Sequence, residues 1–442
     1  MDQLNKNGTV PQIKVLLQTG TTNIDINKQG LLYMKFKRYL NNTLDRSSNI
    51  LTELDLSFYD YTGYDLLGII QQNKSNLFIQ YGFDTEDGSR MSPVYKVTPT
   101  RYRAVQDNRG IVLGVGGFGL QLALNIDNAE NFKEKSSIRD IILHLARRNG
   151  WYTGTEQRST IDIAGTLPNA IVKPAGTRDF DFIQQTLLPI ADRTTVVNNA
   201  GENTGTLIRG QTGFYQATLS EDGGSMRLDV FKQGEGSIDR KVWRYEYGTG
   251  TDSQIISMTN DINYDWIIDG LNMKIPKFDD DYLLSDSELK TKYQDELVSL
   301  EKKVRAIFEA NMLEYPAELK EISLKITLVD PEDLEYKTPN EVIMEQLKNI
   351  LNTLNTIELT VVGNPNIRAT DYIDLRAVNR DGVGLIQQGL WRIIEITENI
   401  GISGYQTVLK LVREVNRDIM KRPINTKGIP NQTKNIAEVI AQ

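Results

Sequence analysis

The stretch from Ile357 to Glu414 constrains the fold most, because short apolar segments follow one another there with turn residues between them. The segments are residues 357–362, 372–377, 390–396 and 405–412. Glycine, which permits positive φ, and proline, which presets the φ of a turn, occupy the connections. Short strands at this spacing predict a small antiparallel barrel or sandwich.

The length and charge of the chain limit the kind of protein it is. A chain of 442 residues exceeds what one ordinary core organises, so we expect about two to four domains. Hydrophobic content of 39% with 24% charged residues is ordinary for a protein with a packed core. A net charge of −8 argues against a protein that grips DNA by neutralising phosphates. A mildly acidic channel would still let DNA slide through without sticking.

Missing residue types exclude several kinds of site. The chain has no Cys and one His, which excludes disulfides, thiolate metal sites, Cys nucleophiles and His-rich metal sites. The polar N-terminus lacks the apolar region of a signal peptide, and no apolar run approaches a membrane span. We therefore expect a protein made and assembled in a cytoplasm, without stable membrane association.

Alternation of apolar and polar residues predicts that residues 1–125 are mainly strands. The expected strands are residues 13–18, 54–58, 77–81 and 120–126, and short helical material is expected near 63–72.

Residues 136–192 change to a helical pattern. Ser137 and Asp140 form a capping box, and Gly150 ends the first helix after an apolar face. A second helix is expected to begin at Thr177 and to be broken by Pro189. Its inward residues are expected to be Phe180, Ile183, Leu187 and Leu188.

The rest of the chain alternates between strands and helices. Strands are expected at 214–219, 226–231, 243–247 and 322–328, and helices at 285–313 and 341–354. The apolar stripe from Leu289 to Ile307 fits packing within its own domain or against a neighbouring subunit. No internal sequence repeat is visible, although two barrels could be structural duplicates without sequence identity.

The ordered motifs in two places resemble one family, the baseplate hub of contractile phage tails. This family includes late control protein D and the hub part of type VI secretion spikes. The first place resembles the hub's C-terminal barrel. It carries Gly363-Asn364-Pro365-x-Ile367, Asp371-x-Ile373, Trp391-Arg392-Ile393 and Gly404-Tyr405-Gln406-Thr407. The second resembles the family's helical insertion, with Ala146-Arg147-Arg148-Asn149-Gly150-Trp151 before Arg178-Asp179-Phe180-Asp181-Phe182-Ile183. The sequence departs from the family at Thr370, where many relatives have Gly, and at Glu398 and Asn399, where a His is common.

The resemblance implies an α+β, mainly β fold with two tail-tube-like antiparallel β-barrel domains and helical insertion domains. We expect the first part of the first barrel at 1–130 and a helical insertion at 131–195. Strands at 196–276 are expected to complete the first barrel and begin the second, followed by a helix-rich insertion with one strand at 277–356. The C-terminal part of the second barrel is expected at 357–415 and an extended C-terminal arm at 416–442.

The resemblance also implies a function, that of a structural hub in a phage tail baseplate. Three chains would form a pseudo-hexameric ring that joins the central spike to the tail tube and leaves a channel for DNA in transit. Expected partners are two further copies, the spike, a tube or tube-initiator protein and other baseplate proteins. Candidate partner contacts are the arm 416–442 and the residues Gly363, Asn364, Pro365, Asp371, Trp391, Gly404 and Tyr405. The expected location is the virion tail.

Three sequence patterns raise chemical alternatives, and each has a simpler interpretation. The run from Gly114 to Gly119 matches G-x-G-x-x-G, but a strand rather than a helix follows. A Gly-rich strand or bulge that another stretch of chain approaches closely is the favoured interpretation. His144 lacks a nucleophile motif and is expected to be a solvated surface residue. Asp279–Asp281 with Asp286 and Glu288 lack EF-hand spacing and suit a helix N-terminus. We expect no catalytic, cofactor or metal residues.

Two other classes of function remain as alternatives. A cell-wall-degrading tail enzyme would need two acids across a sugar groove, which spacing cannot single out among 58 acidic residues. A receptor-binding tail protein would need exposed aromatic clusters. Trp151, Trp243, Trp266 and Trp391 instead lie in patterns that indicate cores.

Overall fold

The structure is a computed structural model. It describes residues 11–19, 22–26, 31–39, 51–60, 75–83, 90–108, 110–119, 129–155, 158–191, 215–222, 225–232, 241–247, 254–264, 272–276, 285–292, 325–329, 353–369, 371–377, 387–401 and 404–413, with single positions at 68, 294, 298, 304, 305, 308, 311, 313, 314 and 350.

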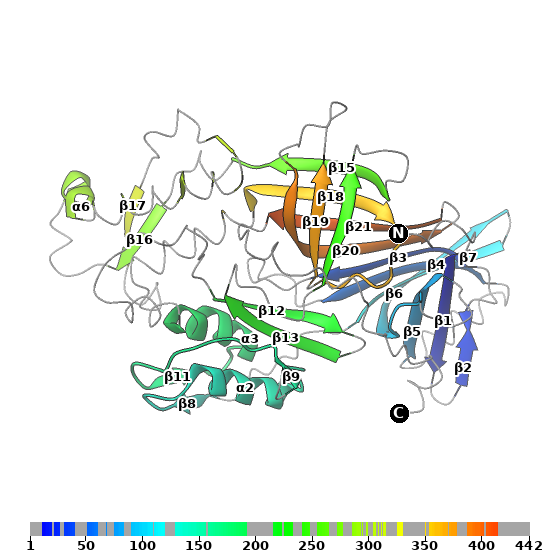
Figure 1. The fold of residues 1–442 in the computed structure, drawn as a ribbon. Coiled ribbons are helices and arrows are strands. Elements are labelled where there is room, and N and C mark those ends of the chain that lie inside the picture. Colours follow the sequence, from blue (N-terminus) through cyan, green and yellow to red (C-terminus); the bar gives the residue numbers. More distant parts are fainter. Residues whose placement is uncertain are drawn as a thin grey trace.

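One 13-stranded sheet dominates the fold and consists of an N-terminal and a C-terminal half (Figure 1). The first half contains β1 (Pro11–Thr19), β2 (Thr22–Asp25), β3 (Leu31–Tyr39), β4 (Thr52–Asp60), β5 (Ser75–Phe83), β6 (Tyr95–Asp107) and β7 (Gly110–Phe118). The second half contains β14 (Val242–Tyr247), β15 (Ile255–Ile262), β18 (Asn355–Val362), β19 (Tyr372–Ala377), β20 (Gly389–Gly401) and β21 (Gly404–Arg413). The predicted mainly β, α+β class is confirmed, and the strands predicted between 357 and 414 are β18 to β21.

Both halves repeat one strand order. In the first half the order is β3-β4-β7-β6-β5-β1, and in the second it is β15-β18-β21-β20-β19-β14. The short strand β2 only extends the first half beyond β1 and is left out of this comparison. Numbered by position in the sequence, the six remaining strands of the first half and the six of the second both read 2-3-6-5-4-1. The first strands differ in direction, because β1 is antiparallel to β5 whereas β14 is parallel to β19. The two halves are thus structural duplicates of a kind that the sequence does not reveal.

The long strand β20 joins the halves because it changes its partner along one edge. Its first residues pair with β19, from Gly389 to Arg392, and its last residues pair with β3, from Glu395 to Gly401. Along its other edge it pairs with β21, where the register shifts between Ile393 and Glu395. Such a bulge increases the local twist of a strand. Figure 1 shows the resulting contact between the blue strand β3 and the brown strand β20.

Each half has its own apolar core, formed by alternate residues of the strands. In β4 the alternation is that of a half-buried strand, with Leu54, Leu56 and Phe58 buried as predicted. The second core contains Trp391, which is fully buried. Two residues of the second half, Ile400 and Tyr405, belong to the core of the first half. The halves therefore share packing as well as a hydrogen-bonded ladder.

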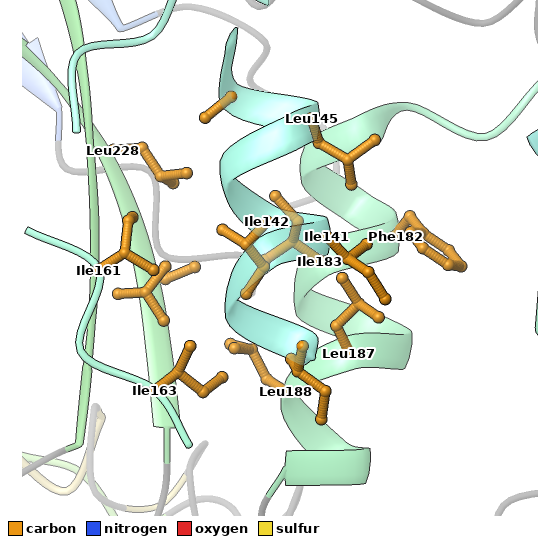
Figure 2. Packing of buried hydrophobic residues seen from close by; sticks show 14 of the residues in the cluster. Ile141, Ile142, Leu145, Ile161, Ile163, Phe182, Ile183, Leu187, Leu188 and Leu228 are labelled. Carbon is orange, nitrogen blue, oxygen red and sulfur yellow. The ribbon is translucent and has the colours of Figure 1, made fainter. Parts of the chain in front are cut away.

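A third core lies mainly in residues 130–232, which separate the two halves in the sequence and which we call the unit between the halves. In it, helices pack against strands (Figure 2). Its elements are β8 (Glu130–Phe132), α2 (Ile138–Asn149), β9 (Gly154–Thr155), β10 (Arg158–Ser159), β11 (Ile171–Lys173), α3 (Asp179–Phe182), the π-helix η2 (Ile183–Leu187), β12 (Tyr215–Asp222) and β13 (Ser225–Lys232). The predicted caps of α2 are confirmed. The Ser137 hydroxyl accepts from the Asp140 N–H, and Gly150 adopts φ 67° at the C-terminus.

The prediction that Pro189 breaks the second helix is wrong. Helical structure continues through Pro189 to Ala191. The turn before it is a π turn, in which the Leu188 N–H binds the Ile183 carbonyl. A π turn shifts the hydrogen-bond pattern immediately before Pro189, which lacks an N–H. The pyrrolidine ring of Pro189 is therefore accommodated without ending the helix.

Strands β12 and β13 pair with each other and pack on the helices rather than pairing with either half of the large sheet. Leu228 of β13 lies opposite Ile142 of α2 in Figure 2. Arg392 of β20 donates a buried hydrogen bond to Gln216 of β12, which ties this unit to the second half. The domain boundaries expected from the sequence stay a proposal.

The remaining described elements are β16 (Asn272–Pro276), β17 (Lys325–Val329) and α6 (Asp286–Lys292). Several predictions lie outside the described residues. These are the strand at 120–126, nearly all of the helices at 63–72 and 341–354, the arm 416–442, Asp279–Asp281 and Trp266. The helix predicted at 285–313 is described in part, and its first residues form α6 as predicted. None of the helices that the structure describes has both the length and the apolar character to cross a membrane.

The glycine run is a strand that neighbouring strands approach closely, as predicted. Gly114, Gly116 and Gly117 lie in β7, and the partner strand β6 bulges opposite Gly116 and Gly117, between Pro99 and Arg101. A Cβ on Gly117 would lie 2.6 Å from the Thr98 carbonyl oxygen, closer than two such atoms can come.

We predict that Gly117→Ala destabilises the protein by about 1–3 kcal/mol, because backbone atoms would have to move. Gly114→Ala is the matched control on the same strand, since its Cβ would lie 3.6 Å from the Arg103 Cβ, an ordinary contact. The control should be neutral or stabilising by about 0.4–1 kcal/mol, because alanine reduces the entropy of the unfolded chain. Urea unfolding of both variants checks this, and equal stabilities would contradict the close-approach explanation.

Candidate functional site

The junction between the two halves is built around a buried ion pair. Arg38 of β3 donates from Nη2 to the Glu398 Oε1 of β20 at 2.5 Å, and the side chains are 5% and 0% exposed. Arg38 also donates from Nη1 to the Ile367 carbonyl at 2.9 Å and to the Tyr95 hydroxyl at 3.2 Å. The second Glu398 oxygen accepts from the Thr407 hydroxyl at 2.6 Å. We call Arg38, Tyr95, Ile367, Glu398 and Thr407 the junction network.

Both charges of the network are held by mutual contacts. Burial alone would lower the pKa of Arg38, but Tyr81, Tyr95 and Glu398 together raise it well above its usual value. Burial raises the pKa of the Glu398 carboxyl, and Arg38 and the Thr407 hydroxyl oppose that rise. A buried charge is tolerated only when it is paired and its remaining polar atoms are hydrogen-bonded.

The turn after β18 is tied to the junction network through Thr407. The Asn364 N–H donates to the Thr407 hydroxyl oxygen at 2.9 Å, and the Asn364 side chain accepts from the Asn366 N–H at 3.2 Å. The Gly363 N–H donates to the Tyr405 carbonyl at 3.0 Å. The Tyr405 ring packs 5.4 Å from the Phe83 ring of the first half. The Gly-Asn-Pro turn of the second half therefore helps to hold the two halves together.

The candidate contact residues are mostly occupied within the chain. Trp391 is fully buried and donates to the Gln387 carbonyl at 2.8 Å, and Tyr405 is 5% exposed. Asp371 is 3% exposed and accepts from the Trp243 Nε1 at 2.8 Å.

The other candidates lie in turns. A Cβ on Gly363 would lie 2.2 Å from the Tyr405 ring, so only glycine fits there. Pro365 is buried and Asn364 is half-buried, whereas Gly404, at φ +107°, is the first residue of β21. The structure brings Gly363, Asn364 and Tyr405 together beside the junction network. Trp391 lies on the neighbouring ladder of β20 and β19, Asp371 immediately precedes β19, and Gly404 pairs with Gly401. Contact of any of these residues with another protein stays a proposal.

The residues raised as chemical alternatives have other partners. His144 is an exposed residue of α2 and lies 2.8 Å from a Glu130 oxygen. Glu288 caps α6 by accepting from the Ser285 N–H at 2.7 Å, as expected for an acid at a helix N-terminus. Within the described ranges, no three His, Cys, Asp or Glu side chains gather as metal ligands.

A second buried charge cluster ties together the two motifs of the helical insertion. Asp179 accepts from the Arg148 Nη2 at 2.5 Å, the Lys173 Nζ at 2.9 Å and the Asn149 Nδ2 at 2.7 Å. Arg148 also donates to Glu130 at 2.8 Å. Burial raises the pKa of Asp179, but these donors outweigh it and hold the pKa below its ordinary value. The cluster locks the start of α3 to the end of α2.

Sequence reasoning missed Arg38 and Lys173, which supply the buried cations of these two clusters. A lysine between apolar residues in β11 and an arginine in an alternating strand resemble ordinary surface positions. The available signal was on the acidic side, since Glu398 departs from the pattern that the sequence otherwise resembles and Asp179 lies inside one of the motifs that carry the resemblance.

Comparison with known proteins gives structural likenesses only. No family model matches the chain, and no curated protein matches it. A tail protein from Neisseria meningitidis MC58 is similar with a TM-score of 0.48 and 12% identity, over 91% of this chain and 97% of that one. The 43 kDa tail protein of prophage MuSo2 from Shewanella oneidensis has a TM-score of 0.48 and 11% identity, over the same shares.

The E. coli c3393 protein is also similar, with a TM-score of 0.41 and 8% identity, over 90% of this chain and 78% of that one. It is described as a component of the type VI secretion system with structural similarity to the T4 tail proteins gp27 and gp5. These three solved structures are thus two tail proteins and a component of a secretion system. At these identities none of them assigns it a function.

Proposed function

We propose that the chain is a structural hub of a phage-type tail baseplate, in which three copies form a ring with two sheet halves from each copy. The ring joins a central spike to the tail tube and leaves a channel through which DNA passes. Its place is the virion tail, after assembly in the host cytoplasm, and its role is mechanical rather than catalytic.

The observation that supports this proposal most is the duplicated strand order of the two halves, which join edge to edge through β3 and β20. Free strand edges are liabilities unless they are paired or covered. A head-to-tail contact that repeats with rotation closes into a finite ring. Three chains with two similar halves each would present six similar units to a sixfold tube and three to a threefold spike. Two of the motifs that resemble the hub family, at residues 363–367 and 404–407, lie beside this junction.

We predict that the purified protein has the mass of three copies, alone or once a candidate spike protein is added. Light scattering over a range of concentrations measures this mass, and a mixture with an unrelated trimeric protein serves as the control. A monodisperse monomer that binds neither spike nor tube proteins would rule out the hub. The alternatives would then be a cell-wall-degrading enzyme and a receptor-binding protein, which peptidoglycan and envelope-binding assays test.

A further inference from the structure

The duplication between the halves extends to individual residues of their hairpins. In both β6–β7 and β20–β21 the last paired residues are three positions apart, Asp107 with Gly110 and Gly401 with Gly404. Asp107 therefore corresponds to Gly401 and Gly110 to Gly404, an offset of 294 positions. The bulges follow the same offset, because the extra residue is Thr100 in β6 and Ile394 in β20.

The second strands of the two halves also match residue by residue. Each pairs with the third strand of its half, and each has one extra residue near its start, Leu32 in β3 and Ile256 in β15. The offset here is 224 positions, so that Arg38 corresponds to Ile262. Bulges fix the register of a ladder and are designed features of a fold, so this agreement defines equivalent positions.

Among the described residues, only one of the two equivalent edges is filled by a strand of the same chain. The edge of β20 from Glu395 to Gly401 pairs with β3. In the described part of the chain, the equivalent edge of β6 and the outer edge of β15 have no strand beside them. The burial agrees, since Ile396, Thr397 and Glu398 are buried whereas their equivalents Tyr102, Arg103 and Ala104 are half-buried or exposed. The segment of β6 therefore has the register and bulge of a strand-accepting edge that no described strand of the same copy fills.

We propose that β15 of one copy pairs antiparallel with β6 of a second copy, in the register that β3 and β20 adopt within the chain. The equivalences place Arg103 opposite Asp261, Val105 opposite Thr259 and Asp107 opposite Ser257. This inference rests on the proposed function, because repetition of this contact is what would close the proposed ring. It adds the strands, the register and the residues that face one another between copies.

The charges at the two edges are complementary and differ in sign from those within the chain. Inside the chain, Lys37 of β3 pairs with Glu395 of β20 at 3.6 Å. The equivalent of Lys37 is Asp261 of β15, and the equivalent of Glu395 is Arg101 of β6. A positive side chain therefore faces a negative one in both contacts. Within the chain the positive charge is on the second strand of a half, and between copies it is on the fifth. Arg101 already binds Glu53 at 3.0 Å, and the exposed Arg103 lies directly opposite Asp261 in the proposed register.

This exchange of sign also disfavours the wrong neighbours. Pairing of β3 with β6 would set Lys37 beside Arg101, and pairing of β15 with β20 would set Asp261 beside Glu395. Like charges across neighbouring strands destabilise a ladder, and repulsion against a wrong partner supplies specificity. First and second halves would therefore alternate around the ring.

The other face of the two strands also suits burial. Met258, Asn260 and Ile262 of β15 are half-buried, where their equivalents Met34, Phe36 and Arg38 are buried. Within the described residues, the Asn260 Oδ1 is buried without a hydrogen-bond partner. A buried acceptor without a donor is costly, and a strand added at this edge would bring backbone and side-chain donors near it.

A disulfide test uses the absence of Cys from the chain. Val105→Cys with Thr259→Cys in one chain should link copies after oxidation, because directly opposed residues have the Cα separation that a disulfide needs. A non-reducing gel should show linked dimers and trimers that disappear on reduction. Lys35→Cys with Asn399→Cys is the matched control at the equivalent pair within the chain, and it should oxidise without any gain in mass. Val105→Cys with Asn260→Cys should not link, because those side chains lie on opposite faces.

The outcomes separate this inference from the proposed function. A multimer by light scattering whose Val105→Cys/Thr259→Cys variant stays unlinked, while the control pair oxidises, would overturn the edge pairing and leave the ring standing. A monomer at all concentrations, without linkage, would overturn both. As a second measurement, Asp261→Arg should dissociate the multimer by placing like charges at Arg103, and addition of Arg103→Asp should restore it. Failure of that restoration in a folded double variant would contradict the register.

Discussion

Glu398→Gln is expected to destabilise the protein by about 3–5 kcal/mol, because it removes the charge that pairs with Arg38 and leaves that guanidinium buried and uncompensated. The variant keeps the shape of the side chain but has one acceptor oxygen in place of two, so the loss combines the missing charge with one of the bonds from Arg38 and Thr407. Urea unfolding gives the size of the effect. Hydrogen exchange shows where it acts, and amides of β3 and the last part of β20 should exchange faster while those of β12 and β13 stay protected.

Two variants make this result specific to the buried pair. Glu395→Gln lies on the same strand, and its carboxylate meets Lys37 at 3.6 Å with both side chains about a quarter exposed. That change should cost about 0–1 kcal/mol. Arg38→Met combined with Glu398→Met should recover most of the lost stability, because apolar residues can replace a buried ion pair at little cost. Equal losses from Glu395→Gln and Glu398→Gln would show that burial at the junction is not what makes the pair important.

Local patterns predicted the local elements of this fold well. The strands between 357 and 414 and the caps of α2 follow from residue alternation, turn residues and a capping serine, all of which act within a few positions. The exception is Pro189, where a π turn that no local pattern announces lets the helix continue. In both regions whose motifs resemble the hub family, segments that are separate in the sequence contact one another. The turn at Gly363 contacts β21, and the end of α2 contacts the start of α3.

Partnerships across the sequence were beyond such reasoning. Arg38 and Glu398 are 360 positions apart, and nothing near either residue names the other. The duplication was hidden for a different reason. Gly114, Gly116 and Gly117 of β7 correspond to Val408, Lys410 and Leu411 of β21, so equivalent positions share hydrogen-bond register but no side-chain character. Register depends on bulges and on strand neighbours, while the side chain depends on what approaches each position. At Gly117 the backbone of β6 approaches, and at Gly116 the side chains of Arg101 and Asp55 do.

The contact candidates show how far motif reasoning reached. It located the turn around Gly363 and Asn364, which the structure places against the junction network. It named Trp391 and Tyr405 as candidates for contact with a partner, and the structure buries both. Strand edges, which carry the proposed contact between copies, have no signature in the sequence, because an edge is defined by a neighbour that is missing.

Asp179→Asn is expected to produce a loss of similar size, about 3–5 kcal/mol at neutral pH, in the unit between the halves. The change leaves Lys173, whose side chain is fully buried, without its carboxylate partner. Asp181→Asn is the control on the same helix, because Asp181 binds the partly exposed Arg178 at 2.6 Å and should contribute about 0.3–0.5 kcal/mol. Thermal unfolding of the three proteins at pH 7 gives the ranking.

The pH dependence of the same variants tests the charge of Asp179 itself. Its folded pKa lies below the unfolded value of about 3.9, so the folded state holds its proton less tightly than the unfolded state does. Its contribution is therefore fully present above that unfolded value and is lost as the pH falls through the folded pKa. The difference in melting temperature between the wild type and Asp179→Asn should shrink steadily below about pH 4, whereas the difference for Asp181→Asn should stay small throughout. A difference for Asp179→Asn that stayed constant from pH 7 to pH 3 would mean that the side chain contributes through its shape and not through its charge.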